Sequence, residues 1–383
     1  MLLISNGHIK TMAGQEYTSG EILIGDDGKI VAIGECVGAP AGVETVNAGG
    51  RLVTPGCVEA HCHIGLQNTA LRWEGYDFNE DADPLTPQMR AIDSINPIDE
   101  AFEQAIKYGV TTACTGPGST NVVGGTFAAI KLVGKRVDKM IVKESVAMKC
   151  AFGENPKEAF GQKRKLPVTR MGVAAMLREL LFKTRSYMAR KDAGENPPFD
   201  MKLEAMIPVL RGELPLKAHV HRADDIFTAI RIAKEFGVRL TLDHCTDGIL
   251  IADELAKEGY PCFVGPSLGR KSKHEVENNT FRTAAVLAEA GVSISIITDA
   301  PITPLERLPL CAGYAVSEGL PYEEAWRAIT VTPAMQMGIG DRVGSLEVGK
   351  DADIVIWLDD PLRVIGVSAY MTVVDGRIVY RAE

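Results

Sequence analysis

Several familiar features are missing from this sequence, and each absence narrows what the protein can be. No apolar run approaches the ~18 residues that a membrane helix needs, and residues 1–10 show no secretory signal pattern. The formal charge is −9, which argues against a nucleic-acid partner. None of the eight cysteines stands in a Cys-x-x-Cys pair, as expected for buried, reduced thiols in a cytoplasmic protein.

The two ends of the chain share a strand-like pattern. Short β-rich runs without helical periodicity occur at residues 2–9, 21–24, 29–33, 352–357 and 371–380. Neither end has enough apolar surface to form a core alone, so we expect the two ends to pair. A chain of 383 residues suits one large domain plus a small one. We predict a small β domain from residues 1–54 plus 343–383.

The middle of the chain alternates between apolar, β-branched runs and amphipathic stretches. This pattern is typical of repeated βα units with a parallel sheet. Strands are expected to end near His63, Thr115, Leu132, Gly153, His221, Cys245, Pro266 and Asp299. Eight strands in one compact unit favour a closed (β/α)8 TIM barrel of the α/β class, which we place at residues 55–342. The segment 155–210 is longer than one crossover needs and is expected to contain two helices.

Histidines are few, but their positions are not random. Four of the seven form two His-x-His pairs, His61/His63 and His219/His221, where random placement would give roughly a tenth of one pair. Side chains at positions i and i+2 of a strand point to the same face. Each pair is therefore expected to project into the barrel near its C-terminal mouth, where barrel enzymes have their active sites.

Two further strand ends carry a potential metal ligand. His244 closes the run 240–244, and Asp299 closes the run 295–299. A lone strand-end histidine is more often structural, but four of them together with a buried carboxylate predict a metal site. We expect one or two divalent ions, with zinc the first choice; iron, manganese and cobalt accept the same ligands.

Three segments resemble motifs of the amidohydrolase superfamily. Residues 53–63 (VTPGCVEAHCH) are similar to its first-strand motif, residues 344–355 (GSLEVGKDADIV) to its C-terminal β-domain motif, and residues 329–334 (ITVTPA) also match. The resemblance spans nearly the whole chain. It implies a TIM barrel with a β-sandwich from both termini, and hydrolysis of an amide or other C–N bond. The imidazolonepropionase-like and metal-dependent dipeptidase branches are the most similar.

The resemblance also implies a role for each strand-end residue. His61 and His63 match the ligands of a first metal, and His219 and His244 match those of a second. Asp299 matches the ligand that is also the general acid/base. His221 is expected near the substrate rather than at the metal, although His219 and His221 could be exchanged.

The number of metals depends on the fourth strand, because two-metal members of the superfamily need a bridging carboxylate there, commonly a carboxylated lysine. Lys149 lies within an apolar strand, where an unpaired ammonium is unfavourable. Glu154 stands at the strand end in a Gly-Glu-Asn-Pro turn. We favour carboxylated Lys149 as the bridge and keep Glu154 as the alternative. A salt-bridged Lys149 would instead leave a site for one metal.

The implied reaction is attack of a metal-activated hydroxide on a carbonyl carbon, with Asp299 as general acid/base. Cyclic amides, N-acyl amino acids and small peptides are all open as small-molecule substrates. A deaminase is the nearest rival, but such enzymes usually carry a glutamate three residues after the fifth-strand histidine, where this chain has Arg222. A non-catalytic scaffold is less favoured because all the ligands are present.

The loop at residues 65–97 is long, rich in acids, and contains Trp73. Loops of this length are uncommon unless they are functional, so we hypothesise a lid or pocket wall, with a solvated insertion as the alternative. Trp73, Arg222 and His221 are the candidate substrate contacts. The sequence leaves the oligomeric state open, a homo-oligomer included.

Overall fold

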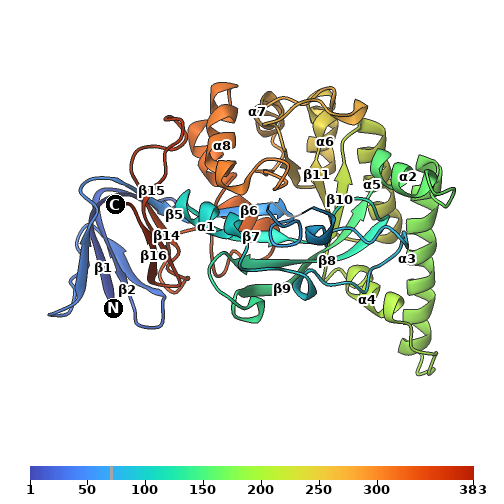
Figure 1. Ribbon diagram of the computed structural model, residues 1–383, viewed down its shortest axis with the longest axis horizontal. Coiled ribbons are helices and arrows are strands. Elements are labelled where there is room, and N and C mark those ends of the chain that lie inside the picture. The colour runs from blue at the N-terminus through green and yellow to red at the C-terminus, as the bar shows by residue number, and fades with distance from the viewer. Residues whose placement is uncertain (70–71) are drawn as a thin grey trace.

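A computed structural model describes residues 1–69 and 72–383 of the chain. It has two parts (Figure 1): a strand-rich part at the left that contains both termini, and a larger part in which helices surround the strands. None of the helices in these described ranges combines the length and hydrophobicity that a bilayer span requires.

The larger part is an eight-stranded barrel whose strands follow one another in sequence order. They are β6 (Cys57–Cys62), β7 (Val110–Thr115), β8 (Val123–Lys131), β9 (Ile141–Ala151), β10 (Leu216–Val220), β11 (Leu240–His244), β12 (Cys262–Val264) and β13 (Ile294–Ile296). Strands β13 and β6 are in contact where the barrel closes, and the His63 backbone N–H donates to the Ala300 carbonyl there (2.7 Å). The predicted TIM-barrel class is confirmed.

One barrel strand departs from the parallel arrangement that the sequence pattern predicts. β8 pairs antiparallel with both β7 and β9, so a parallel third strand was the wrong expectation. The reason is the short connection at 116–122, since a parallel neighbour needs a crossover of about a dozen residues or more. Thr112 at the start of β7 pairs with Lys131 at the end of β8. Lys131 therefore lies at the pole of the barrel opposite the mouth.

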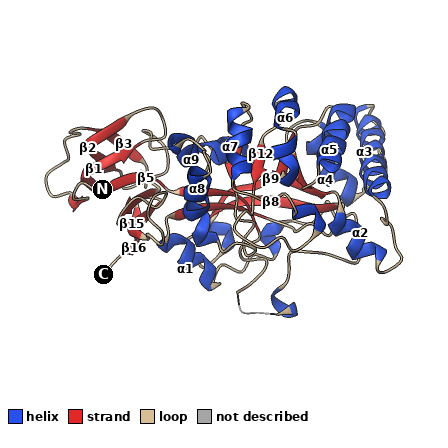
Figure 2. Ribbon diagram, turned by 90° about the horizontal axis from the view of Figure 1, so that it is seen from above, coloured by secondary structure: helices blue, strands red, loops and turns tan. Residues whose placement is uncertain are grey.

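Helices cover the outside of the barrel (Figure 2). In the described residues they are α1 (Glu100–Lys107), α2 (Glu154–Gly161), α3 (Arg170–Asp192), α4 (Met201–Leu210), α5 (Ala223–Phe236), α6 (Ala252–Glu258), α7 (Arg282–Glu289), α8 (Leu308–Ser317), α9 (Tyr322–Arg327) and α10 (Val331–Gln336).

The segment 155–210 contains parts of three helices, α2, α3 and α4, rather than the two that we expected. The additional helix is the short α2. Its Gly-Glu-Asn-Pro start looks like a turn in the sequence, but proline is tolerated in the first turn of a helix. Side chains cap the other two, because Thr169 accepts from the Gly172 N–H (3.0 Å) and Asp200 from the Lys202 N–H (2.9 Å).

The terminal strands form one separate sheet, and the prediction that the two ends pair is confirmed. Its members are β1 (Leu2–Lys10), β2 (Glu16–Ile24), β3 (Ile30–Gly34), β4 (Glu44–Asn47), β5 (Leu52–Pro55), β14 (Ile354–Trp357), β15 (Ala369–Val374) and β16 (Arg377–Arg381). β14 from the end of the chain pairs antiparallel with β5 from its start. Ile4 and Ile22 share one fully buried apolar core with Ile354 and Met371.

The buried ammonium of Lys131 connects the barrel to this β domain. Lys131 contacts Asp351 (3.0 Å), Asp353 and Asp375 (3.3 Å). All three carboxylates belong to the C-terminal segment that pairs with the start of the chain. The far pole of the barrel is thus fastened to the β domain by ion pairs.

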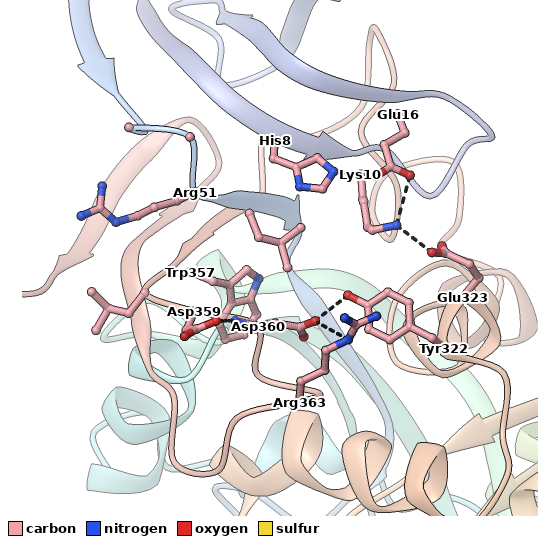
Figure 3. Close-up of a pocket in the computed structure, with 14 residues that line it drawn as sticks. His8, Lys10, Glu16, Arg51, Tyr322, Glu323, Trp357, Asp359, Asp360 and Arg363 are labelled. Carbon is pink, nitrogen blue, oxygen red and sulfur yellow. Dashed lines mark hydrogen bonds and ion pairs between the residues drawn. The ribbon is translucent and has the colours of Figure 1, made fainter.

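A cleft of about 620 Å³ lies where β1 approaches α9 and the loop after β14 (Figure 3). Several of its polar groups are paired with one another. Lys10 contacts Glu323 (2.7 Å), and Asp360 accepts from the Tyr322 hydroxyl (2.8 Å) and pairs with Arg363 (3.3 Å). The cleft is thus a junction between elements that these pairs hold together.

Candidate metal centre

The structure brings the strand-end histidines and Asp299 together at the barrel mouth. Two groups of potential ligand atoms each lie within 4.8 Å of one another. One consists of His61, His244 and Asp299, and the other of His219, His221 and His244. Because His244 belongs to both groups, the two groups form one continuous cluster drawn from β6, β10, β11 and the segment after β13.

Hydrogen bonds orient two of the imidazoles toward the centre of the cluster. Nδ1 of His63 lies 2.7 Å from the Gly116 carbonyl oxygen, and Nδ1 of His244 lies 2.7 Å from the Gly265 carbonyl oxygen. A carbonyl oxygen only accepts, so each Nδ1 carries the hydrogen and each Nε2 presents a lone pair. Nε2 of His63 lies 3.2 Å from Asp299 Oδ1.

His244 Nε2 is the atom that most clearly requires a partner. It is buried, and it has no hydrogen-bond partner within the described residues. An unsatisfied buried acceptor is unfavourable and uncommon. A cation at the centre of the cluster would satisfy it.

The backbone is unusual at two of these residues. His244 has φ of 73° and Asp299 has φ of 52°, in the left-handed region that residues with a side chain rarely adopt. Such conformations concentrate at functional sites. At the end of β11 the left-handed turn also breaks the alternation of side chains, so that Asp243 and His244 both approach His61.

Burial favours the neutral form of four of the histidines, and this is the form that binds a metal. Burial lowers the pKa of His61 and brings the pKa of His244 to about 3. Burial, together with the neighbouring imidazoles, lowers the pKa of His219 and of His221 well below the usual range. Neutral imidazoles around a carboxylate form a donor set that fits zinc or a similar divalent ion.

The two candidate bridging residues lie in different places. Lys149 is fully buried on β9, with its Nζ 3.4 Å from His61 Nε2. Glu154 begins α2, beside Asn155. It is Asn155 in this turn that approaches an imidazole, with its Nδ2 3.4 Å from His219 Nε2. The geometry therefore favours Lys149 over Glu154 as the residue next to the cluster.

The candidate substrate contacts lie at different distances from the cluster. His221 is part of it, and its Nδ1 lies 2.8 Å from the Thr246 hydroxyl. Arg222 pairs with Asp224 (3.0 Å) just before α5. Trp73 is 86% exposed on its loop. All three roles stay predictions, and that of Trp73 would require the loop to move.

Part of the loop at 65–97 approaches the cluster; its residues 70 and 71 lie outside the described ranges. The ring centroid of Phe78 is 5.3 Å from that of His63. Asn79 Oδ1 accepts from the backbone N–H (3.1 Å) and the hydroxyl (2.9 Å) of Thr120. The loop is thereby fastened to the connection between β7 and β8, and Phe78 is its contact with the site.

Sequence reasoning missed several polar residues that surround the cluster. Glu59 accepts from the His61 N–H (2.9 Å), the Thr298 N–H (2.9 Å) and the Thr298 hydroxyl (2.6 Å). It thus connects β6 with the segment just before Asp299. Because Glu59 stands two residues before His61, the alternation rule could have placed it in the barrel interior.

Lys217 and Asp243 were also missed. Lys217 stands two residues before His219, so the same rule could have found it. Asp243 had no such signal, because strict alternation would point it away from a site that contains His244. Asp243 nevertheless lies 2.8 Å from Nδ1 of His61 and 2.9 Å from Nζ of Lys217.

Comparison with known proteins identifies the class to which this fold and site belong. Residues 211–379 match the model of the amidohydrolase family. The crystal structure of an amidohydrolase from Thermotoga maritima MSB8 has a TM-score of 0.96 and 38% sequence identity, over 100% of both chains. The chain belongs to the amidohydrolase family.

Curated relatives are more distant. Amidohydrolase tasK of Hapsidospora irregularis is 29% identical over 358 residues, which are 86% of this chain but only 36% of that protein. Imidazolonepropionase of Bacillus velezensis is 26% identical over 372 residues, 86% of this chain and 81% of its own length. Because the matched proteins include both hydrolases and deaminases, they support an amidohydrolase-superfamily hydrolase or deaminase.

Proposed function

We propose that this protein hydrolyses an amide or other C–N bond, using one or two divalent metal ions at the barrel mouth. The observation that carries the proposal is the convergence of buried imidazoles and Asp299 around the unpartnered Nε2 of His244. His61 and His63 would hold one ion, and His219 and His244 a second, with Asp299 beside them.

The residues of the cluster have distinct roles in this proposal. Bound divalent ions would lower the pKa of a water molecule and polarise the carbonyl oxygen of a substrate. Asp299 accepts the proton of the attacking water and returns it to the leaving nitrogen. Its Oδ1 is positioned between His61 Nε2 (3.3 Å) and His63 Nε2 (3.2 Å). His221 faces the substrate oxygen, where negative charge develops.

Carboxylated Lys149 is our choice for the bridging ligand. The neutral amine attacks carbon dioxide, one N–C bond forms, and one proton is released. The resulting carbamate would lie beside His61 Nε2, which is 3.4 Å from Nζ. K149A should lose one metal equivalent, and propionate should restore it. A metal content unchanged in K149A but reduced in E154Q would transfer the role to Glu154.

Deamination is the alternative within the family. The position three residues after His219 carries Arg222, which pairs with Asp224 (3.0 Å), instead of the glutamate usual in deaminases. Hydrolysis of an amide releases an amine or amino acid, or opens the ring of a cyclic amide, whereas a deaminase releases ammonia. Ammonia release from an aminopurine or a cytosine by the metal-loaded enzyme, with no amide cleavage, would reverse our preference.

Metal stoichiometry is the first test. Purified protein is reconstituted with zinc, manganese, iron or cobalt and measured by elemental analysis, and the loaded enzyme is then assayed against dipeptides, N-acyl amino acids and cyclic amides. We expect one or two equivalents and turnover of one of these classes. Protein that retains no divalent ion after reconstitution would refute the proposal.

A further inference from the structure

We propose that Asp243 and Lys217 form a buried ion pair that positions His61 for metal binding. Neither residue belongs to the proposed ligand set, and both are 0% exposed, so both are positioning residues. This inference rests on the proposed metal site and deepens it.

Asp243 and His61 contact each other closely in the barrel interior. Asp243 Oδ2 lies 2.8 Å from His61 Nδ1, and neither atom has a hydrogen-bond partner elsewhere in the described residues. The contact is close but falls short of full hydrogen-bond geometry. The opposite nitrogen of the same ring, Nε2, faces Asp299 Oδ1 at 3.3 Å. The imidazole therefore spans from a buried carboxylate to the centre of the cluster.

A carboxylate beside Nδ1 determines how the ring can bind a metal. It favours the tautomer with the hydrogen on Nδ1, which leaves the lone pair on Nε2 directed at the cluster. Carboxylate–histidine–metal arrangements of this kind also hold the ring orientation and raise the basicity of the ligand. His63 and His244 achieve the same tautomer with backbone carbonyls. His61 has Asp243 in that position.

Lys217 makes the buried carboxylate possible. Lys217 and Asp243 are both 0% exposed, and Lys217 Nζ lies 2.9 Å from Asp243 Oδ1. The ammonium also lies 3.9 Å from the ring centroid of Phe263, so its remaining surroundings are largely apolar. A lone charge in such a place is strongly unfavourable, but a hydrogen-bonded pair is tolerated.

The other charged groups in the interior do not replace this pair. Lys149 Nζ lies farther from Asp243, at 3.7 Å from Oδ2. Glu59 is occupied by the His61 N–H and by Thr298. Asp243 is thus the acid that contacts both His61 Nδ1 and Lys217, and the two oxygens of one carboxylate serve the two partners.

Removing the two charges together tests the inference, since removing one alone would leave the other buried and unpaired. K217M/D243L deletes the pair and leaves His61 Nδ1 without an acceptor. K217M/D243N deletes both charges but retains an amide oxygen beside Nδ1. The matched control is K131M/D353N, which removes a buried ion pair at the opposite pole of the barrel. Circular dichroism verifies that each variant is folded.

The readout is zinc affinity, measured by competition with a chromophoric chelator, and the visible spectrum of the cobalt-substituted protein. We expect a loss of zinc affinity of about 10- to 100-fold in K217M/D243L, a smaller loss in K217M/D243N, and wild-type affinity in the control. The cobalt spectrum should change in the first two variants and not in the control. If the pair contributed only to packing, the cobalt spectra of K217M/D243L and K217M/D243N would equal that of the wild type. The two variants would then not show the expected order of zinc affinities.

Failure of this inference is distinguishable from failure of the proposed function. If wild-type protein binds none of zinc, manganese, iron and cobalt, the metal site itself is refuted. If wild-type protein binds zinc and K217M/D243L binds it equally well, the positioning role is refuted while the site stands. Should K217M/D243L not fold, K217M/D243N decides, because wild-type affinity and spectrum in that variant would also overturn the inference.

Discussion

Replacing Lys131 with methionine should destabilise the protein strongly, although Lys131 lies at the pole of the barrel farthest from the metal centre. The side chain is 4% exposed and contacts Asp351 (3.0 Å), Asp353 and Asp375 (3.3 Å). Methionine occupies a similar volume but supplies no charge. The substitution therefore leaves buried carboxylates without their cation at the junction between barrel and β domain.

The magnitude follows from what remains around each carboxylate. Removing one partner of a buried ion pair typically costs about 3–5 kcal/mol. Asp351 keeps Arg342 (2.8 Å) and Lys29, and Asp353 keeps the backbone N–H of Asp375 (3.0 Å). These remaining partners reduce the loss, so we expect a decrease in the free energy of unfolding of about 3 kcal/mol.

Urea unfolding followed by far-ultraviolet circular dichroism provides the measurement, with the free energy obtained by linear extrapolation. The control is R136Q, which breaks the exposed Arg136–Asp138 pair (2.7 Å) a few residues along the chain and should change nothing measurable. K131M/D353N should be more stable than K131M, because the unpaired charge is removed too. An unfolding midpoint of K131M equal to that of the wild type would refute the reasoning.

The pH dependence of this effect has a definite sign. Burial opposes the ionisation of Asp351, but the charge of Lys131 and the hydrogen bond from Lys29 outweigh it and lower its pKa below the ordinary value of 3.8. A carboxyl group of this kind stabilises the fold above its unfolded pKa, and the contribution is lost as pH falls through the folded pKa. The contribution of Asp351 to the stability difference between wild type and K131M should therefore shrink below about pH 4.

Three further substitutions test other parts of the structure. D299N should reduce turnover by about 10²- to 10⁴-fold while elemental analysis finds nearly the wild-type metal content; retained turnover would exclude Asp299 as the general base. E59A removes the acceptor that connects β6 to the segment before Asp299, so urea unfolding should show a loss of at least about 1–3 kcal/mol, and an unchanged midpoint would contradict the connection. G109A adds a Cβ atom 2.4 Å from Trp357 Cη2 at φ of 77°, and overpacking should cost about 1–3 kcal/mol beyond the backbone strain. G212A is the control, because its φ of 72° imposes the backbone strain while no atom lies within 4 Å of the added Cβ. Equal losses of stability in G109A and G212A would exclude a clash with Trp357.

Much of the metal centre could be predicted because strand periodicity and strand ends are visible in a sequence. In the pairs His61/His63 and His219/His221, the residues lie two positions apart, and every second side chain of a barrel strand faces the interior. The ends of parallel strands share one pole, so residues far apart in the chain could be expected to meet. These two rules place the histidines without any knowledge of contacts.

The antiparallel strand β8 (Val123–Lys131) could not be predicted from its own composition. Its apolar pattern is that of any buried strand, and the direction of a strand is set by the connection before it. The length of residues 116–122 was the available signal, since a helical crossover does not fit in it. This strand direction determines where Lys131 lies. The end of β8 faces the β domain, so Lys131 forms ion pairs there and does not lie at the barrel mouth.

The position of Asp243 in the barrel interior could not be predicted from the alternation of side chains along a strand. On a regular strand, Asp243 and His244 would face opposite sides, and choosing His244 as a ligand would exclude Asp243 from the interior. The left-handed backbone at His244 (φ of 73°) brings both side chains into the barrel interior. No sequence pattern predicts that a histidine will adopt the left-handed conformation. A carboxylate buried in the barrel interior is unfavourable without a nearby cation. Lys217 supplies this cation, with its Nζ 2.9 Å from Asp243 Oδ1. One strained backbone angle thus couples a candidate metal ligand to an ion pair deeper in the barrel, and a substitution at that pair should change the metal binding proposed for His61.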